Sequence, residues 1–179
     1  MPSAPDMAQL LYAACQCSSF IYDPITQSDH DLVPVMSRTP SMTGTEKAAC
    51  IWKMGSTNSL IVSIRGTASA ADHMVNMNGT PKDASSVFVS LFSIQSLTSM
   101  TADESSFKDF GTESLVNAHG GFLACAQILI PSLLQDIARH LKSDPSVDRI
   151  IFTGHSAGGA VASLIFLRFL CQTPPECEL

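Results

Sequence analysis

The sequence contains a serine in a setting that suits nucleophilic chemistry. Residues 152–160 read Phe-Thr-Gly-His-Ser-Ala-Gly-Gly-Ala, so that Gly154 and Gly158 flank Ser156 in a Gly-x-Ser-x-Gly pattern. This pattern is typical of a nucleophile elbow, a sharp strand-to-helix turn that exposes the serine hydroxyl. Small residues on both sides let the backbone turn without clashing with its neighbours. We therefore predict that Ser156 is a catalytic nucleophile, with Gly154, His155 and Gly158 as the other elbow residues.

A serine hydroxyl is a weak nucleophile and needs a general base, usually a histidine that a carboxylate orients. In an α/β-hydrolase fold, the carboxylate and the histidine both follow the serine along the chain. Residues 157–179 contain no His and no Asp, and their only acidic residues are Glu176 and Glu178. The sequence therefore predicts a nucleophile without its base, in a fold that is incomplete at the C-terminus.

Two backbone segments could stabilise the oxyanion that forms when a serine attacks an ester. Residues 64–67, Ile-Arg-Gly-Thr, end an apolar run, where Gly66 permits close backbone approach and Thr67 offers both an N–H and a hydroxyl. A helix that begins at Ala157 would present free N–H groups and the positive end of its dipole. We expect these two segments to lie beside Ser156.

A histidine precedes the next long helix, in the segment His-Gly-Gly-Phe at 119–122. We interpret His119 as a structural residue, because the chain order of this fold places the base after the serine. His155 adjoins Ser156 and cannot reach back to the neighbouring hydroxyl in the geometry of a base.

Together these segments resemble the fungal-type, class 3 lipases. The match rests on Ser-Ile-Arg-Gly-Thr at 63–67 followed by Asp72, on the segment 119–122, and on the elbow at 154–160; it covers about residues 7–172. The resemblance implies an α/β-hydrolase fold with a mostly parallel sheet flanked by helices.

The resemblance also implies roles for individual residues. Ser156 corresponds to the nucleophile, and the backbone N–H groups of Thr67 and Ala157 correspond to the oxyanion hole. The short helix expected at 69–77 corresponds to the lid, where His73 replaces the tryptophan that is usual in the family. No residue of this sequence corresponds to the catalytic Asp and His of the family.

The periodicity predicts the elements that must position these residues. Helices are expected at 4–22, 69–77, 122–141 and 157–172, with a kink or a split at Pro131. The last helix is apolar nearly all round, so it is expected to be buried. Alternation of apolar and polar residues predicts a half-buried strand at 48–54, and apolar runs predict strands at 60–64 and 148–153. The strands at 48–54 and 60–64 are expected to form a hairpin. Residues 23–44 and the stretch 78–118 are expected to be turn-rich or irregular, within a single domain over 1–179.

The composition excludes several classes of protein. Of the 179 residues, 45% are apolar and 15% are charged, which indicates a globular chain, and the net charge of −6 argues against nucleic acid as a partner. Six scattered cysteines show no metal or redox spacing, so no metal or cofactor is expected and the thiols are interpreted as free. The N-terminus lacks a basic region and its apolar run is short, so we expect no signal peptide and a cytoplasmic protein. The longest apolar stretch, 160–170, is interrupted by Arg168 and is too short to span a bilayer, so we expect no integral membrane segment.

The function that the sequence favours is hydrolysis of a lipid-like carboxylic ester through an acyl-serine intermediate. The alternative from another class is a catalytically inactive fragment or pseudoenzyme, for which the absent base argues. Acyl transfer to an alcohol other than water would use the same residues and stays open. An incomplete sheet would leave an unpaired edge and an uncovered apolar face on the helix at 157–172, so self-association through that edge is also expected.

Overall fold

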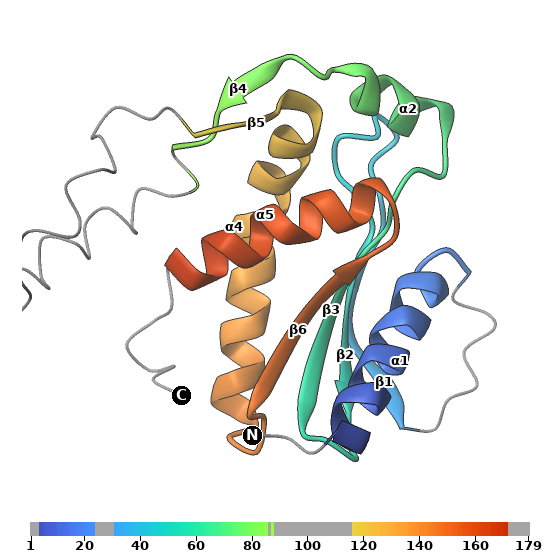
Figure 1. Cartoon of the computed structure of the whole chain (residues 1–179), viewed down its shortest axis with the longest axis vertical. Helices are drawn as coiled ribbons and strands as arrows, with labels where there is room; N and C mark the ends of the chain where they lie inside the picture. The colour runs from blue at the N-terminus through green and yellow to red at the C-terminus, as the bar shows by residue number, and fades with distance from the viewer. Residues whose placement is uncertain (1–3, 24–30, 86, 88–115, 172–179) are drawn as a thin grey trace, which may run out of the picture.

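The computed structural model describes residues 4–23, 31–85, 87 and 116–171. Its elements follow in chain order: α1 (Ala4–Phe20), β1 (Leu32–Arg38), β2 (Ala49–Met54), β3 (Ser59–Ile64), α2 (Ala70–Met77), β4 (Pro81–Asp83), β5 (Asn117–His119), α4 (Gly120–Ser143), β6 (Arg149–Gly154) and α5 (Ala157–Cys171). Figure 1 shows a sheet in the middle, with α1 on one face and α4 and α5 on the other.

The main sheet has the strand order β1-β2-β3-β6. β1, β2 and β3 pair antiparallel, whereas β3 and β6 pair parallel with Ile64 opposite Gly154, so both strands end at the same level. The predicted α/β class and the hairpin at 48–64 are confirmed, and the described sheet is mixed. The parallel pair carries the chemistry-bearing segments, because loops at the carboxyl ends of parallel strands meet at one edge of the fold.

Alternate side chains of β2 and β3 build two cores, one on each face of the sheet. One core packs α4 and α5 against Ile51, Leu60 and Val62, and the other packs α1 against Trp52 and Ile61. The prediction of a half-buried strand at 48–54 is therefore wrong, since β2 is covered on both faces. The alternating side chains of β2 enter two different apolar cores, and neither face of the strand is exposed to solvent.

The prediction that 23–44 is turn-rich missed a strand. β1 occupies Leu32–Arg38 despite Pro34, and its register with β2 shifts between Pro34 and Met36. A proline is tolerated here because β1 is an edge strand and a bulge needs no ladder hydrogen bond from it. Residues 24–30 of the same stretch lie outside the described residues.

The helix predicted at 122–141 runs from Gly120 to Ser143 and is not split at Pro131. By length and composition alone, α4 is the one described helix that could cross a membrane. It contributes Leu129 and Leu133 to the core with no exposed surface, as expected of a core helix covering a sheet.

The ends of the stretch 78–118 form a small antiparallel sheet, in which β4 pairs with β5 from Pro81 opposite His119 to Asp83 opposite Asn117. Residues 88–115 of this stretch lie outside the described residues.

The expectation that the last helix is buried is wrong for one of its faces. Val161 and Ile165 of α5 are fully buried, but Phe166, Leu167 and Leu170 are 40%, 37% and 47% exposed. They lie open because β6 is the last strand of the described sheet, so α5 has sheet beneath only part of its surface.

Candidate active site

Ser156 sits on a strained turn between β6 and α5. Its φ of 55° lies in the left-handed region, which only one other described non-glycine residue, Asn58, also adopts. Gly158 N donates to His155 O at 3.0 Å and Gly159 N donates to Ser156 O at 2.9 Å, which closes the turn. Positive φ at a serine costs free energy and persists only where its surroundings enforce it. The turn leaves Ser156 exposed, as a nucleophile requires.

The glycines around Ser156 are required by close backbone packing. A Cβ on Gly158 would lie 2.2 Å from Ile64 O, and one on Gly154 would lie 2.5 Å from the backbone carbon of Gly158. A Cβ on Gly66 would lie 2.4 Å from His155 O. The segment after β3 and the elbow after β6 are therefore in direct backbone contact, with no space for a side chain between them.

This contact brings together the two segments expected to form an oxyanion hole. Thr67 directly follows Gly66, and Ala157 directly precedes Gly158. These two glycines are in contact, since a Cβ on Gly158 would lie 2.8 Å from Gly66 N. Ala157 is the first residue of α5, so its N–H has no acceptor within the helix. Thr67 is held through its side chain, since Asn76 Nδ2 of α2 contacts Thr67 Oγ1.

A buried ion pair holds the backbone that follows Thr67. Lys47 and Asp72 are 0% and 1% exposed, and Lys47 Nζ lies 2.6 Å from Asp72 Oδ1. The other oxygen of Asp72 accepts hydrogen bonds from Ala68 N at 3.1 Å and from Ser69 N at 3.0 Å. One carboxylate therefore fixes the backbone that follows Thr67 and ties it to the loop before β2.

The same carboxylate starts α2. Ser69 is the N-cap, and it forms a capping box with Asp72 at the third helical position. Burial acts to raise the pKa of Asp72, but hydrogen bonds from Lys47, Ala68 and Ser69 outweigh it and hold the pKa at about 2. α2 lies where the sequence predicts it. His73, Met74 and Met77 are exposed on its surface, with Met74 and Met77 at 73% and 82%.

The described histidines near this site have structural contacts and none is bonded to Ser156. His119 caps α4, where its Nδ1 accepts from Phe122 N at 3.4 Å and its ring stacks on Phe122 at 4.0 Å. This agrees with the structural role inferred for His119. His155 Nδ1 lies 3.4 Å from Tyr22 Oη. Among the described residues, no imidazole is hydrogen-bonded to the Ser156 hydroxyl.

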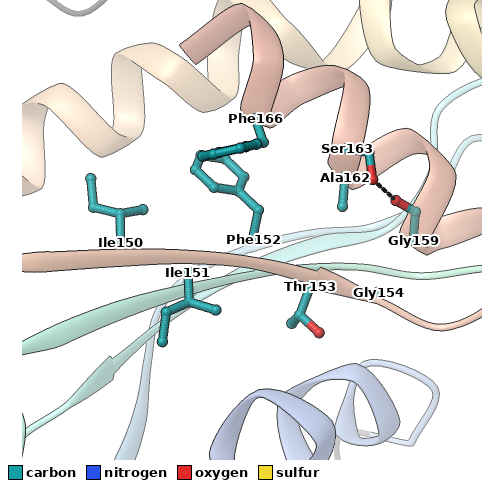
Figure 2. A pocket seen from close by; sticks show the side chains of 9 residues that line it. All are labelled: Ile150, Ile151, Phe152, Thr153, Gly154, Gly159, Ala162, Ser163 and Phe166. Atoms are coloured by element: carbon teal, nitrogen blue, oxygen red, sulfur yellow. Dashed lines mark hydrogen bonds between the residues drawn. The ribbon is translucent and has the colours of Figure 1, made fainter. Parts of the chain in front are cut away.

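A groove of about 480 Å³ runs along the outer side of β6. Figure 2 shows Phe152 pointing from β6 toward Phe166 of α5, whereas Ile151 and Thr153 point to the opposite face of the sheet. The groove reaches Gly154 and Gly159 of the elbow, but Ser156 does not line it. Within the described ranges, no group of three or more metal-ligating side chains is present.

Sequence reasoning missed three residues that hold this site together. Lys47 and Asn76 carry no local pattern, because their partners Asp72 and Thr67 are specified by the fold. Tyr22 lies beyond the end of α1, and its hydroxyl accepts a hydrogen bond from Gly66 N at 2.9 Å. No spacing in the sequence links residue 22 to residue 66.

The family model that describes the class 3 lipases matches residues 61–177 of this chain. The match begins within β3 and runs past the elbow, so it includes every segment on which the resemblance rests. No curated protein sequence matches the chain significantly.

Solved structures of fungal lipases share the fold. The triacylglyceride lipase of Rhizomucor miehei matches with a TM-score of 0.63 and 17% identity, over 98% of this chain and 58% of that one. The lipase of Rhizopus microsporus var. chinensis matches with a TM-score of 0.63 and 20% identity, over 96% and 54%. A triacylglycerol lipase whose catalytic centre is a serine-protease triad matches with a TM-score of 0.64 and 18% identity, over 97% and 58%. This chain thus spans less than two thirds of the length of each.

Proposed function

This chain belongs to the class 3 lipase family, and on that premise we propose that Ser156 is the nucleophile of an enzyme that hydrolyses carboxylic esters of lipids. The observation that carries the proposal is the strained turn: Ser156 is exposed at a φ of 55°, between glycines that allow two strand ends to touch. A backbone conformation of this kind costs free energy and occurs mostly at functional sites, which supports a catalytic role for Ser156.

In the proposed reaction, Ser156 Oγ attacks the ester carbonyl carbon and transfers its proton to a general base. The carbonyl oxygen becomes an oxyanion, which the N–H groups of Thr67 and Ala157 stabilise. The tetrahedral intermediate expels the alcohol, which takes the proton from the base, and an acyl-serine ester remains. Water then attacks this ester, and the acid is released with Ser156 restored.

We propose that the base is not one of the described histidines. His119 Nδ1 serves as a helix cap and His155 Nδ1 faces Tyr22, so neither ring is bonded to Ser156. The related lipase with a serine-protease triad indicates what is needed, a histidine with a carboxylate behind it. We propose that a segment outside residues 1–179 supplies both groups in the active protein.

Labelling by a fluorophosphonate tests this proposal, because the probe needs an activated serine and an accessible one does not suffice. We expect residues 1–179 to label slowly, and imidazole added as an external base to accelerate the reaction. The Ser156→Ala variant is expected to lose the accelerated labelling. Equal labelling of wild type and Ser156→Ala would contradict the assignment of the nucleophile. Fast labelling without imidazole, lost in Ser156→Ala, would instead place the base within this chain, with His119 as the first residue to test.

A second candidate is a non-catalytic class 3 lipase domain, which is favoured because no imidazole of the described residues is hydrogen-bonded to Ser156. It predicts that imidazole does not accelerate labelling. The strained turn favours the enzyme, since a domain that only binds a lipid needs no exposed serine at positive φ.

A further inference from the structure

Tyr22 lies between the two segments that carry the proposed oxyanion donors. Its hydroxyl accepts from Gly66 N at 2.9 Å and lies 3.4 Å from His155 Nδ1 of the elbow. The rings of Tyr22 and His155 meet edge to face, with centroids 6.1 Å apart. Tyr22 is thus in contact with both the β3 end and the β6 end, although it belongs to neither strand.

The packing at Gly66 shows how tight this arrangement is. A Cβ there would lie 2.5 Å from Tyr22 Oη, 2.4 Å from His155 O and 3.4 Å from Gly158 N. Three segments distant in sequence therefore converge on one glycine. Tyr22 and His155 thus both border Gly66, and a change at either alters the surroundings of this glycine.

The hydrogen bond to Gly66 matters because it lies one peptide before the Thr67 donor. The Thr67 N–H belongs to the peptide on the carboxyl side of Gly66, and glycine has the largest conformational freedom of any residue. Holding the Gly66 N–H fixes the preceding peptide, so that only the φ and ψ of Gly66 can still turn the Thr67 N–H. The contact of Asn76 with the Thr67 side chain restrains the following residue. The Tyr22 hydroxyl accepts from Gly66 N and can donate its own proton to His155 Nδ1 when that nitrogen carries none. Both ends of the oxyanion hole are then tied to the same oxygen.

We propose that Tyr22 is a positioning residue that holds the Thr67 and Ala157 N–H groups in the direction an oxyanion requires. This inference rests on the proposed function of Ser156. Tyr22 reaches the donors only through Gly66 and His155, and it is assigned no role in proton transfer.

The test compares Tyr22→Phe with Tyr12→Phe, in residues 1–179. These are the only two tyrosines in the sequence, and Tyr12 is 67% exposed on α1. Two quantities are measured: amide exchange at Gly66, and fluorophosphonate labelling of Ser156 with imidazole as the external base. Melting midpoints of both variants show whether the fold is kept.

We expect Tyr22→Phe to raise the Gly66 exchange rate and to lower the maximal labelling rate about tenfold, less than the loss of a whole oxyanion donor. The probe concentration at half-maximal rate should stay within about twofold, since the effect is on the transition state. Tyr12→Phe should change neither quantity.

Unchanged exchange at Gly66 in Tyr22→Phe would overturn the inference, and so would faster exchange with an unchanged labelling rate. A loss of labelling explained entirely by a lower melting midpoint would also overturn it. If wild type and Ser156→Ala label equally, the proposed function itself fails and this inference falls with it. The Ser156→Ala comparison therefore separates the two failures.

Discussion

The two ends of the parallel pair β3–β6 are built very differently. At the carboxyl ends, Gly66, Gly154 and Gly158 leave no space for a Cβ, and the buried Lys47–Asp72 pair lies behind them. At the amino ends, Asp148 N donates to Asn58 O across an open turn, and the ion pair of Lys53 with Asp144 is partly exposed. Hydrogen bonds also hold the amino ends, such as those of Ser56 with Asp31, but they are exposed to solvent, whereas the carboxyl ends are closely packed around a buried ion pair. An oxyanion hole needs hydrogen-bond donors that are held in fixed positions, and the carboxyl ends of the two strands provide this.

The largest expected difference between the two ends is the effect of replacing a glycine by alanine on folding. Gly158→Ala places a Cβ 2.2 Å from Ile64 O and 2.8 Å from Gly66 N, so we expect the variant not to fold. Gly55→Ala is the matched control in the turn after β2, where the nearest atom is a side-chain oxygen of Asp31 at 3.3 Å. We expect its unfolding free energy to stay within about 1 kcal/mol of wild type. Circular dichroism with urea titration measures both, and a stable Gly158→Ala would break the comparison.

The two ion pairs should differ next. Asp72→Asn leaves the Lys47 ammonium buried and uncompensated, which should cost about 3–5 kcal/mol of unfolding free energy. Asp144→Asn removes a partner from Lys53 where both side chains reach solvent, so its effect should be much smaller. Urea denaturation of both variants checks this. Similar losses in the two variants would show that the carboxyl end is no better supported than the other.

The pH dependence of stability tests the Asp72 ion pair by itself. Hydrogen bonds lower the pKa of Asp72 from its ordinary 3.8 to about 2, against the effect of burial. A lowered folded-state pKa means that the stabilisation is complete above about pH 4 and is lost as the pH falls through 2. Wild type should lose about 2 kcal/mol from this group over that window. The pKa of Asp144 is also lowered to about 2, chiefly by Lys53, so Asp72→Asn should flatten the pH profile without abolishing it. An equally steep profile in Asp72→Asn would contradict this assignment.

The smallest expected effect on the folded monomer concerns the edges of the sheet. β1 is interrupted by Pro34 and a bulge, whereas β6 carries no proline and lies under the exposed Phe166 and Leu170 of α5. We propose that the chain self-associates through the β6 edge, because unpaired apolar edges promote strand pairing between molecules. Light scattering should show association that the double variant Phe166→Ser, Leu170→Ser reduces and Val33→Ser, at the β1 edge, does not. A monomeric wild type would contradict the proposal.

The sequence predicts what local patterns encode. The elbow, the strand at 60–64 and the helix at 70–77 were predictable, because each is specified by neighbouring residues. β1 was not, since a proline normally argues against a strand and only its edge position makes Pro34 acceptable. The apolar pattern of α5 alone predicts burial, whereas its exposed face matches the uncovered surface expected of an incomplete sheet.

The candidate site divides in the same way. Ser156, Thr67 and Ala157 were identified from motifs, and the structure brings their segments into contact. Lys47, Tyr22 and Asn76 could not be identified, because their contacts cross 25, 44 and 9 residues with no periodicity behind them. Residues that position a site do so through tertiary contacts. Local motifs therefore identify the reacting residues but not the residues that hold them in place.

We propose that the carboxyl end of β3–β6 is a preformed oxyanion hole beside Ser156. A crystal structure of residues 1–179 after prolonged reaction with a phosphonate and imidazole tests it most directly. We expect a phosphorus bonded to Ser156 Oγ, with the phosphoryl oxygen about 2.7–3.1 Å from the backbone nitrogens of Thr67 and Ala157. A phosphonate on another residue would contradict the proposed site, as would a phosphoryl oxygen on Ser156 that points into solvent, away from both nitrogens.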